Sequence, residues 1–151
     1  MPTRYHGSRV EIRALDTFIK LVRGTNSLFG ALRIPLQRDF GLTDSQLGVL
    51  ETIHHLGPLP QGQICQKILK SGSNVTTVVD NLERDGLVRR VRYESDRRVQ
   101  VVHLTAKGRA LIEEAFPAHA ARIAACMSTL TSAEQDELGR LCRKLGRAMA
   151  G

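Results

Sequence analysis

The chain has 151 residues, 42% of them hydrophobic, so it is long enough for one domain with a core and too apolar for a wholly disordered protein. Its formal net charge of +7 favours polyanionic partners, with nucleic acid ahead of an anionic membrane surface. No apolar run reaches the roughly 18 residues of a transmembrane helix, and the N-terminal residues lack the apolar core of a signal peptide. We therefore expect a cytoplasmic protein without membrane contacts.

Side chains that could support catalysis or metal binding are scattered. Cys65, Cys126 and Cys142 are odd in number and far apart, which excludes a disulfide framework or a CxxC clip and predicts reduced, mostly buried thiols. The five histidines include no pair at i,i+4 spacing. The sequence contains no GxSxG, HExxH, P-loop or paired-carboxylate motif. It therefore predicts neither an enzyme nor a metal site, and no cofactor.

The first predicted element is a long amphipathic helix from about Val10 to Leu36, with apolar residues at helical spacing. The weak helix formers Gly24-Thr25-Asn26-Ser27 could bend it. Pro35 and then Gly41 are expected to close it.

Two shorter helices are expected next. Thr43 and Gln46 have the spacing of a capping box, which predicts a helix start, and Gly57-Pro58 predicts its end. A third helix follows around Gln61 to Leu69, with Ile64 and Ile68 directed inward.

A turn at residues 70–73 then leads into a helix whose two faces differ sharply. One face is an apolar stripe of Val75, Val78, Val79 and Leu82 at i, i+3, i+4 and i+7 spacing, and Gly86 is placed to end the helix. The opposite face is polar and consists of Ser73, Asn74, Thr76, Thr77, Asn81 and Arg84. Two helices joined by a tight, glycine-containing turn form a helix-turn-helix, and the second presents its N-terminal end to phosphate and base edges.

The next two segments, 87–92 and 99–104, alternate like strands and predict a hairpin with a polar tip at residues 93–98. A polar-faced helix followed by a basic-tipped hairpin is typical of a winged-helix DNA-binding protein. Between Lys67 and Arg109 there are ten Lys/Arg against five Asp/Glu, a net charge of +5. This concentration favours a DNA-facing patch over a solvated basic surface.

Two more helices complete the chain. Thr105 is expected to cap a helix that runs to about Ser128 and bends near Pro117, and Thr131 and Glu134 form a second capping box for the last helix. These helices and the first one have more apolar surface than a small winged helix can cover, which predicts pairing with a second copy of the chain. The expected fold is mainly α with a small β-hairpin wing.

Three motifs, in this order and spacing, carry a family resemblance: NLERDGLV beginning at Asn81, the triplet Asp96-Arg97-Arg98, and LTAKG at residues 104–108. Together they resemble the MarR-type (multiple-antibiotic-resistance regulator) transcription factors over nearly the whole chain. The resemblance implies an N-terminal dimerisation helix region at residues 1–40, a winged helix-turn-helix lobe at 41–104 and C-terminal dimerisation helices at 105–151. It implies a homodimer that binds double-stranded DNA at a pseudo-palindromic operator, most simply as a repressor.

Arg98 is the first candidate for DNA contact, since an arginine on a wing tip can enter a narrow, A·T-rich minor groove. Asp96 can orient it, and the resemblance assigns the Asp-x-Arg pair that role; a plain surface ion pair is the alternative. On the helix, Ser71 or Ser73 can act as a cap while others read bases. No arginine precedes Arg84 on that face, which favours shape readout over guanine readout. The DNA-binding candidates are Ser73, Asn74, Thr76, Thr77, Arg84, Asp96, Arg97 and Arg98.

The resemblance also implies a pocket for a small aromatic or phenolic effector between the dimerisation helices and the lobe. The stretches LGPLPQGQI and Phe116-Pro117-Ala118-His119 resemble a branch associated with quinone and catechol response. Candidate lining residues, for each of which core packing or exposure is the alternative, are Phe18, Phe29, Arg33, His54, His55, Phe116 and His119.

Cys65 is the candidate for a redox switch, although its place beside Ile64 predicts burial, which disfavours a reactive thiolate. The alternatives to a ligand-released regulator are a redox-sensing regulator of the same fold, a DNA binder without sequence preference, and a winged helix used for protein contacts.

Overall fold

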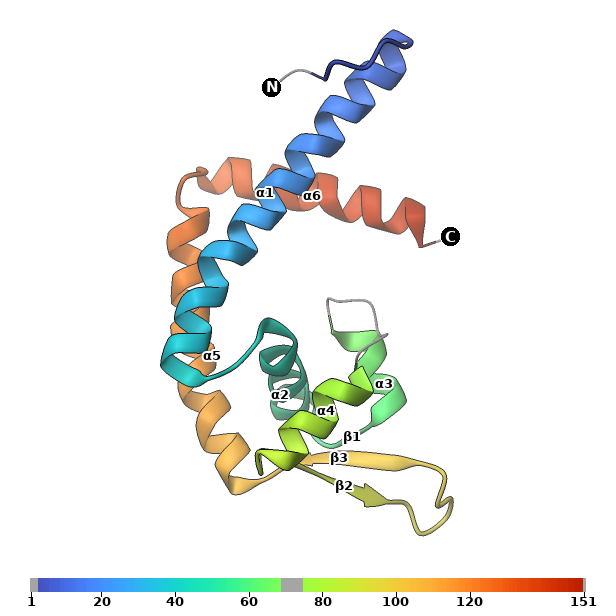
Figure 1. Cartoon of the computed structure of the whole chain (residues 1–151), viewed down its shortest axis with the longest axis vertical. Coiled ribbons are helices and arrows are strands. Elements are labelled where there is room, and N and C mark those ends of the chain that lie inside the picture. The colour runs from blue at the N-terminus through green and yellow to red at the C-terminus, as the bar shows by residue number, and fades with distance from the viewer. Residues whose placement is uncertain (1–2, 69–74, 151) are drawn as a thin grey trace. The chain divides into compact units, whose positions relative to one another are not determined.

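The computed structural model describes residues 3–68 and 75–150, which form two compact units, Met1–Phe116 and Pro117–Gly151. The elements are labelled in Figure 1. Their bounds are α1 (Arg9–Phe40), α2 (Asp44–Leu56), β1 (Leu59–Pro60), α3 (Gln61–Lys67), α4 (Val75–Arg84), β2 (Val88–Arg92), β3 (Gln100–Leu104), α5 (Ala106–Met127) and α6 (Ser132–Met149). The mainly helical fold with a β-hairpin is as the sequence predicts.

Helix α1 begins and ends at local signals. The Ser8 hydroxyl accepts from the backbone N–H of Glu11 at 3.1 Å, and Gly41 ends the helix in the left-handed conformation at φ 66°. The expectation that Pro35 helps to close the segment is wrong, because the helix continues through it to Phe40. Proline removes only one backbone hydrogen-bond donor, so the helix continues past it. It ends at Gly41, where glycine can adopt a positive φ.

Helix α2 begins at the predicted capping box. The Thr43 Oγ1 accepts from the Gln46 backbone N–H at 3.1 Å, and the Gln46 Oε1 accepts from the Thr43 backbone N–H at 3.0 Å. The helix ends at Gly57, at φ 84°, as expected. Both ends of α2 are therefore fixed by residues at or directly beside the helix termini.

Replacing Thr43 by alanine should lower the free energy of unfolding by about 1 kcal/mol, the usual contribution of an N-cap hydroxyl. Thr43 is exposed, so the change creates no cavity. Urea denaturation with a constant slope would measure it, and a Thr43→Ser variant, which keeps the hydroxyl, should unfold like the unchanged protein. Equal midpoints for all three proteins would contradict the role of the cap.

The helices of the helix-turn-helix bury their predicted apolar faces. Ile64 of α3 is buried, and Val75, Val79 and Leu82 form the buried stripe of α4. Val78 is only partly buried but packs against the same core. Gly86 follows α4 at φ 75°, the predicted left-handed end.

The wing strands belong to a three-stranded antiparallel sheet with the order β1-β3-β2. Within the hairpin, Val88 pairs with Leu104 and Arg92 with Gln100, so the register matches the predicted strands. Strand β1 was missed: it has two residues, one of them Pro60, and it pairs with Val101 and Val102 of β3. Proline is tolerated there because β1 is an edge strand.

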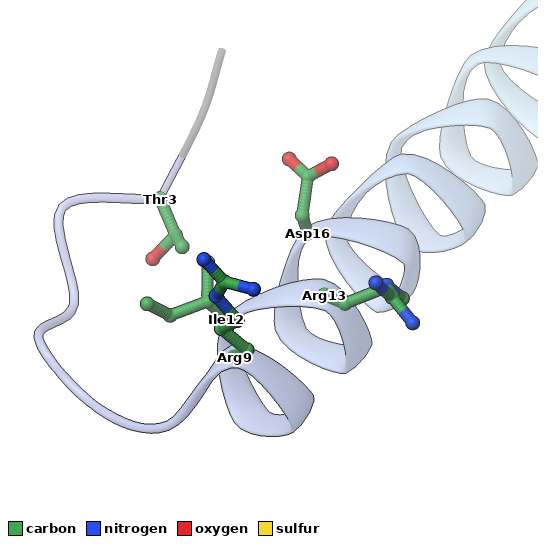
Figure 2. Close-up of a pocket in the computed structure, with 5 residues that line it drawn as sticks. All are labelled: Thr3, Arg9, Ile12, Arg13 and Asp16. Atoms are coloured by element: carbon green, nitrogen blue, oxygen red, sulfur yellow. The ribbon is translucent and has the colours of Figure 1, made fainter.

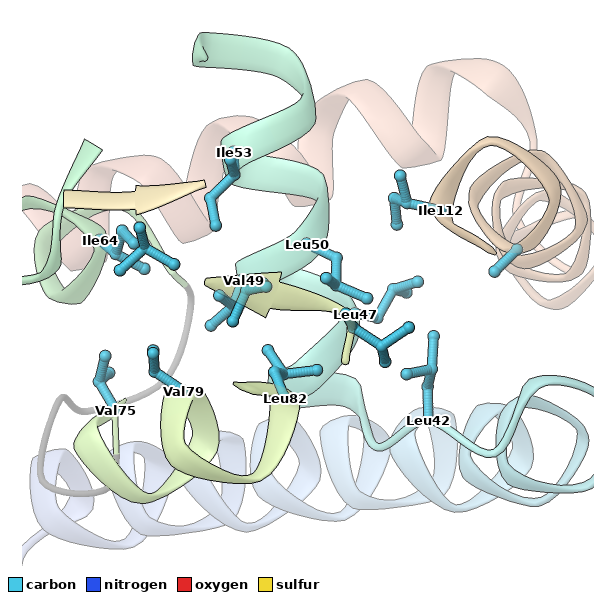
Figure 3. Close-up of a cluster of buried hydrophobic side chains, with 14 of the residues drawn as sticks. Leu42, Leu47, Val49, Leu50, Ile53, Ile64, Val75, Val79, Leu82 and Ile112 are labelled. Carbon is cyan, nitrogen blue, oxygen red and sulfur yellow. The ribbon is translucent and has the colours of Figure 1, made fainter. Parts of the chain in front are cut away.

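The core lies between α2, α4, the sheet and the first half of α5. Figure 3 shows Leu47, Leu50 and Leu82 converging from two helices, with Ile112 of α5 on one side. Leu36 extends this core to the last turns of α1. The winged-helix lobe is therefore held together by its own apolar contacts, and its polar faces remain exposed.

The last two helices start at the predicted caps. The Thr105 Oγ1 accepts from the Gly108 backbone N–H at 3.0 Å, and Thr131 and Glu134 form both hydrogen bonds of the second capping box. Helix α5 continues through Pro117, where the division between the two compact units falls, and a bend at that point stays a prediction. Across the described part of the chain, no helix has the length and apolarity needed to cross a membrane.

Candidate nucleic-acid interface

The outward face of α4 carries the polar side chains predicted to meet DNA. Thr76 and Thr77 are exposed in the first turn, and Arg84 is exposed in the last turn. The Arg84 Nε lies 3.5 Å from the Asp85 Oδ1. Two further candidates, Ser73 and Asn74, lie outside the described residues. Helix α4 therefore offers short hydroxyl side chains near its N-terminus and a cation near its C-terminus.

The wing tip presents Arg98 to solvent, with 91% of its side chain exposed. Asp96 orients it: the Asp96 Oδ1 accepts from the Arg98 Nε at 3.2 Å and from the Arg98 backbone N–H at 3.0 Å, and its Oδ2 accepts from the Arg98 Nη2 at 3.5 Å. The predicted Asp-x-Arg pair is therefore formed within the tip. Arg97, between them, is also exposed.

The same hydrogen bonds set the charge of Asp96. Donation by the Arg98 side chain, and secondarily by its backbone amide, lowers the pKa of Asp96 below its ordinary value. Because the pKa of Asp96 is lowered, the ion pair is fully formed at pH values above the ordinary pKa of aspartate. It is lost only as the pH falls through the lowered pKa. At neutral pH the carboxylate is ionised and the orientation of the arginine is maintained.

One cation of the predicted basic patch lies in a different environment. Arg90, on β2, has only 14% of its side chain exposed and forms ion pairs with Asp80 and Glu83 of α4 at 2.6 and 3.2 Å. Its Nε also donates to the Gln61 Oε1 of α3 at 2.9 Å. Arg90 thus belongs to the interior of the lobe, whereas Arg89 and Arg92 on the same strand are exposed.

The sequence contained a signal for this arrangement that we missed. Alternate residues of a strand share a face, so Arg90 lies on the face that Val88 buries in the core. A charged group on an apolar face needs charged and hydrogen-bonding partners. The acidic residues of α4 and Gln61 fill that need.

The LTAKG motif joins the wing to α5 and also contacts the end of α4. The Thr105 Oγ1 donates to the Gly86 carbonyl at 2.6 Å, and the Lys107 Nζ donates to the Asp85 carbonyl at 2.9 Å. Gly108 is buried so closely against the backbone of Leu87 that a Cβ added there would lie 2.0 Å from its carbonyl oxygen. The start of α5 is therefore fixed to the end of α4.

The predicted ligand residues fall on three helices. Phe18, Phe29 and Arg33 are exposed on α1, as are His54 and His55 on α2. His54 Nε2 lies 3.3 Å from the Glu113 Oε1 of α5.

On α5 itself, Phe116 is exposed, while His119 is buried and belongs to the second compact unit. A hollow at the start of α1 is lined by none of the seven predicted ligand residues (Figure 2). Its lining residues are Thr3, Arg9, Ile12, Arg13 and Asp16. The ligand-binding roles therefore stay predictions.

The thiols differ in exposure. Cys65 is half-buried against the core, Cys126 is half-buried, and Cys142 is exposed, so the expectation of buried thiols is wrong for Cys142. It lies on α6, none of whose residues is buried in the single chain. Within residues 3–68 and 75–150, no group of three or more His, Cys, Asp and Glu side chains is placed to hold a metal ion.

Helices α3 and α4 with the β2–β3 hairpin define a winged helix-turn-helix, a class of DNA-binding fold. The family model for the MarR family matches residues 40–99. The chain is also 34% identical over 134 residues to the HTH-type transcriptional regulator MhqR of Bacillus subtilis, a match that covers 89% of this chain and 92% of MhqR. The chain therefore belongs to the MarR family of DNA-binding transcription regulators.

Solved structures share the fold. Sco3205, a MarR family regulator of Streptomyces coelicolor crystallised in complex with DNA, superimposes with a TM-score of 0.83 at 23% identity, over 96% of this chain and 91% of that chain. BpsR of Bordetella bronchiseptica, whose DNA binding is regulated by 6-hydroxynicotinic acid, superimposes with a TM-score of 0.77 at 25% identity, over 87% of this chain and 98% of that chain.

Proposed function

We propose that this regulator is a homodimeric repressor that binds a pseudo-palindromic operator and is released from it by a small aromatic or phenolic ligand. The observation that carries the DNA-binding part is the wing tip, where Arg98 is exposed and oriented by Asp96. In this proposal the wing tip enters a minor groove while Thr76 and Thr77, in the first turn of α4, contact the adjacent major groove.

Homodimer formation is supported by the apolar side chains that α1 and α6 leave exposed in the single chain. Phe18 of α1 is 61% exposed, and α6 buries no residue. The exposed apolar residues of the two helices are Val10, Phe18, Leu21, Val22, Leu28, Phe29, Ile34, Leu138, Leu141, Leu145 and Met149. Surface of this kind favours an isologous pairing that would place two α4 helices about one turn of DNA apart.

The ligand class is supported by a relative. BpsR responds to 6-hydroxynicotinic acid, an aromatic anion, and the candidate residues of this chain combine aromatic rings with Arg33 and His54, which suit such a ligand. Release from DNA also requires that the ligand bind the two conformations of the dimer with different affinities.

The deciding experiment is binding of the full chain to the DNA immediately upstream of its own gene, with excess competitor DNA, in the presence and absence of phenols, quinones and oxidants. We expect specific binding that weakens steeply with salt, since phosphate neutralisation releases counterions, and that is lost on adding one aromatic compound. Loss only with an oxidant, reversed by a reductant, would instead identify a thiol switch. Binding that competitor DNA removes would indicate a DNA binder without sequence preference.

A further inference from the structure

Arg90 connects three elements of the winged helix through one guanidinium group. From β2, its Nη2 lies 2.6 Å from the Asp80 Oδ1 and its Nη1 lies 3.2 Å from the Glu83 Oε1, both on α4. Its Nε donates to the Gln61 Oε1 of α3 at 2.9 Å, and its Nη2 donates to the Thr76 carbonyl at 3.4 Å, in the first turn of α4. Both the beginning and the end of α4 are therefore tied to the wing strand by the same side chain.

Two more hydrogen bonds extend this network. The Arg90 backbone N–H donates to the Glu83 Oε2 at 2.9 Å, and the Gln61 Nε2 donates to the Thr76 Oγ1 at 3.1 Å. Thr76 is thus held through both its carbonyl and its hydroxyl. A rotation or a slide of α4 along β2 would break several of these bonds together, so the network resists such movements more than a single ion pair would.

The charge of Arg90 is largely neutralised within this network. Its side chain is 14% exposed, and two carboxylates face it. Those carboxylates keep 56% (Asp80) and 43% (Glu83) of their side chains exposed, so replacing the arginine leaves both acids in contact with water. Removing one acid leaves Arg90 paired with the other, so neither change creates an isolated buried charge. Variants at these positions should therefore remain folded.

We propose that Arg90 is a positioning residue for DNA recognition: it holds α4 at the angle from which Thr76 and Thr77 reach the DNA while the wing carries Arg98. The proposal rests on the proposed function, in which these surfaces bind an operator. It assigns Arg90 a geometric role in specificity and removes it from the cations that contact phosphate.

Glu83→Ala distinguishes the two roles by the sign of its effect. The variant removes a negative charge from a lobe that faces DNA, so a purely electrostatic account predicts tighter binding. It also removes two acceptors of the Arg90 network. Loss of positioning should therefore weaken operator binding by roughly tenfold, as measured by fluorescence anisotropy on labelled operator DNA.

Arg90→Lys tests the geometry at constant charge. A lysine ammonium lacks the planar fork of donors that reaches α3 and both ends of α4 together. We expect operator affinity to fall by roughly tenfold, while affinity for competitor DNA, which depends on total charge, stays within about twofold. The matched control is Arg92→Lys, on the same face of β2 but exposed, which should leave both affinities unchanged.

All variants are compared well below their thermal unfolding midpoints, so that the ratio of operator to competitor affinity reports positioning and not loss of folded protein. If the unchanged protein binds its operator specifically, tighter binding by Glu83→Ala or wild-type affinity in Arg90→Lys would overturn the role of Arg90. The proposed function would then still stand. Absence of specific binding by the unchanged protein would overturn the proposed function, and the inference with it.

Discussion

Substituting alanine for Gly108 is expected to lower the free energy of unfolding of the winged-helix lobe by at least about 2 kcal/mol, in the range of overpacked interior sites. The added Cβ would lie 2.0 Å from the Leu87 carbonyl oxygen and 2.9 Å from its carbonyl carbon. Both are backbone atoms, so no flexible side chain can move aside. Leu87 is buried between α4 and β2, and α5 would have to shift away from the core to relieve the contact.

The matched control is Gly48→Ala, in the middle of α2 in the same compact unit. The nearest atom to a Cβ there is the Ile68 Cγ2 at 3.7 Å, an ordinary van der Waals contact. Alanine in a helix interior is favoured over glycine by roughly 0.5–1 kcal/mol, so this variant should be as stable as the unchanged protein or more so. Urea denaturation followed by circular dichroism measures both. If Gly108→Ala unfolded at the wild-type midpoint, close packing at the α4–α5 junction would be disproved.

The same junction couples the start of α5 to the end of α4. Thr105 and Lys107 bind the carbonyls of Gly86 and Asp85 at the end of α4. A displacement of the first turn of α5 is therefore transmitted to the end of α4 through direct hydrogen bonds. If the ligand proposed above displaced α5, these hydrogen bonds would carry the displacement to the DNA-facing helix.

The sequence predicted best those elements whose ends are set by neighbouring residues. The capping boxes at Thr43 and Thr131 and the positive-φ glycines at 41, 57 and 86 depend on side chains and backbone freedom within a few residues. The apolar stripe of α4 likewise follows from helical spacing alone. Interactions between residues close in sequence determine these positions, so the helices and the hairpin could be predicted from the sequence.

Features that depend on distant partners were missed. Strand β1 exists only because Leu59 and Pro60 meet the free edge of β3 more than 40 residues later, and no two-residue segment signals that by itself. Arg90 was counted with the exposed cations because its partners lie on two other elements. The Asp96–Arg98 pair was predictable for the opposite reason, since both groups lie on one short turn.

Arg98→Ala is expected to weaken operator binding by about 1–3 kcal/mol, the cost of one good groove contact, without changing the stability of the lobe. The side chain is 91% exposed and packs against nothing in the core, so its removal leaves no cavity. If Arg98 enters an A·T-rich minor groove, the loss should be largest for operators with A·T pairs at that position. It should shrink when those pairs are changed to G·C, where the groove is wider and less negative.

Asp96→Ala and the double variant test whether the carboxylate acts through the arginine. If Asp96 only orients Arg98, its removal should weaken binding in the wild-type background and have little effect once Arg98 is alanine. Independent action would give the opposite result: removing the negative charge would strengthen binding in both backgrounds. Arg97→Ala serves as the matched control, because it removes one exposed cation from the same tip without disturbing the pair. Equal losses of operator affinity for Arg97→Ala and Arg98→Ala would mean that the wing contributes only positive charge and not an oriented groove contact.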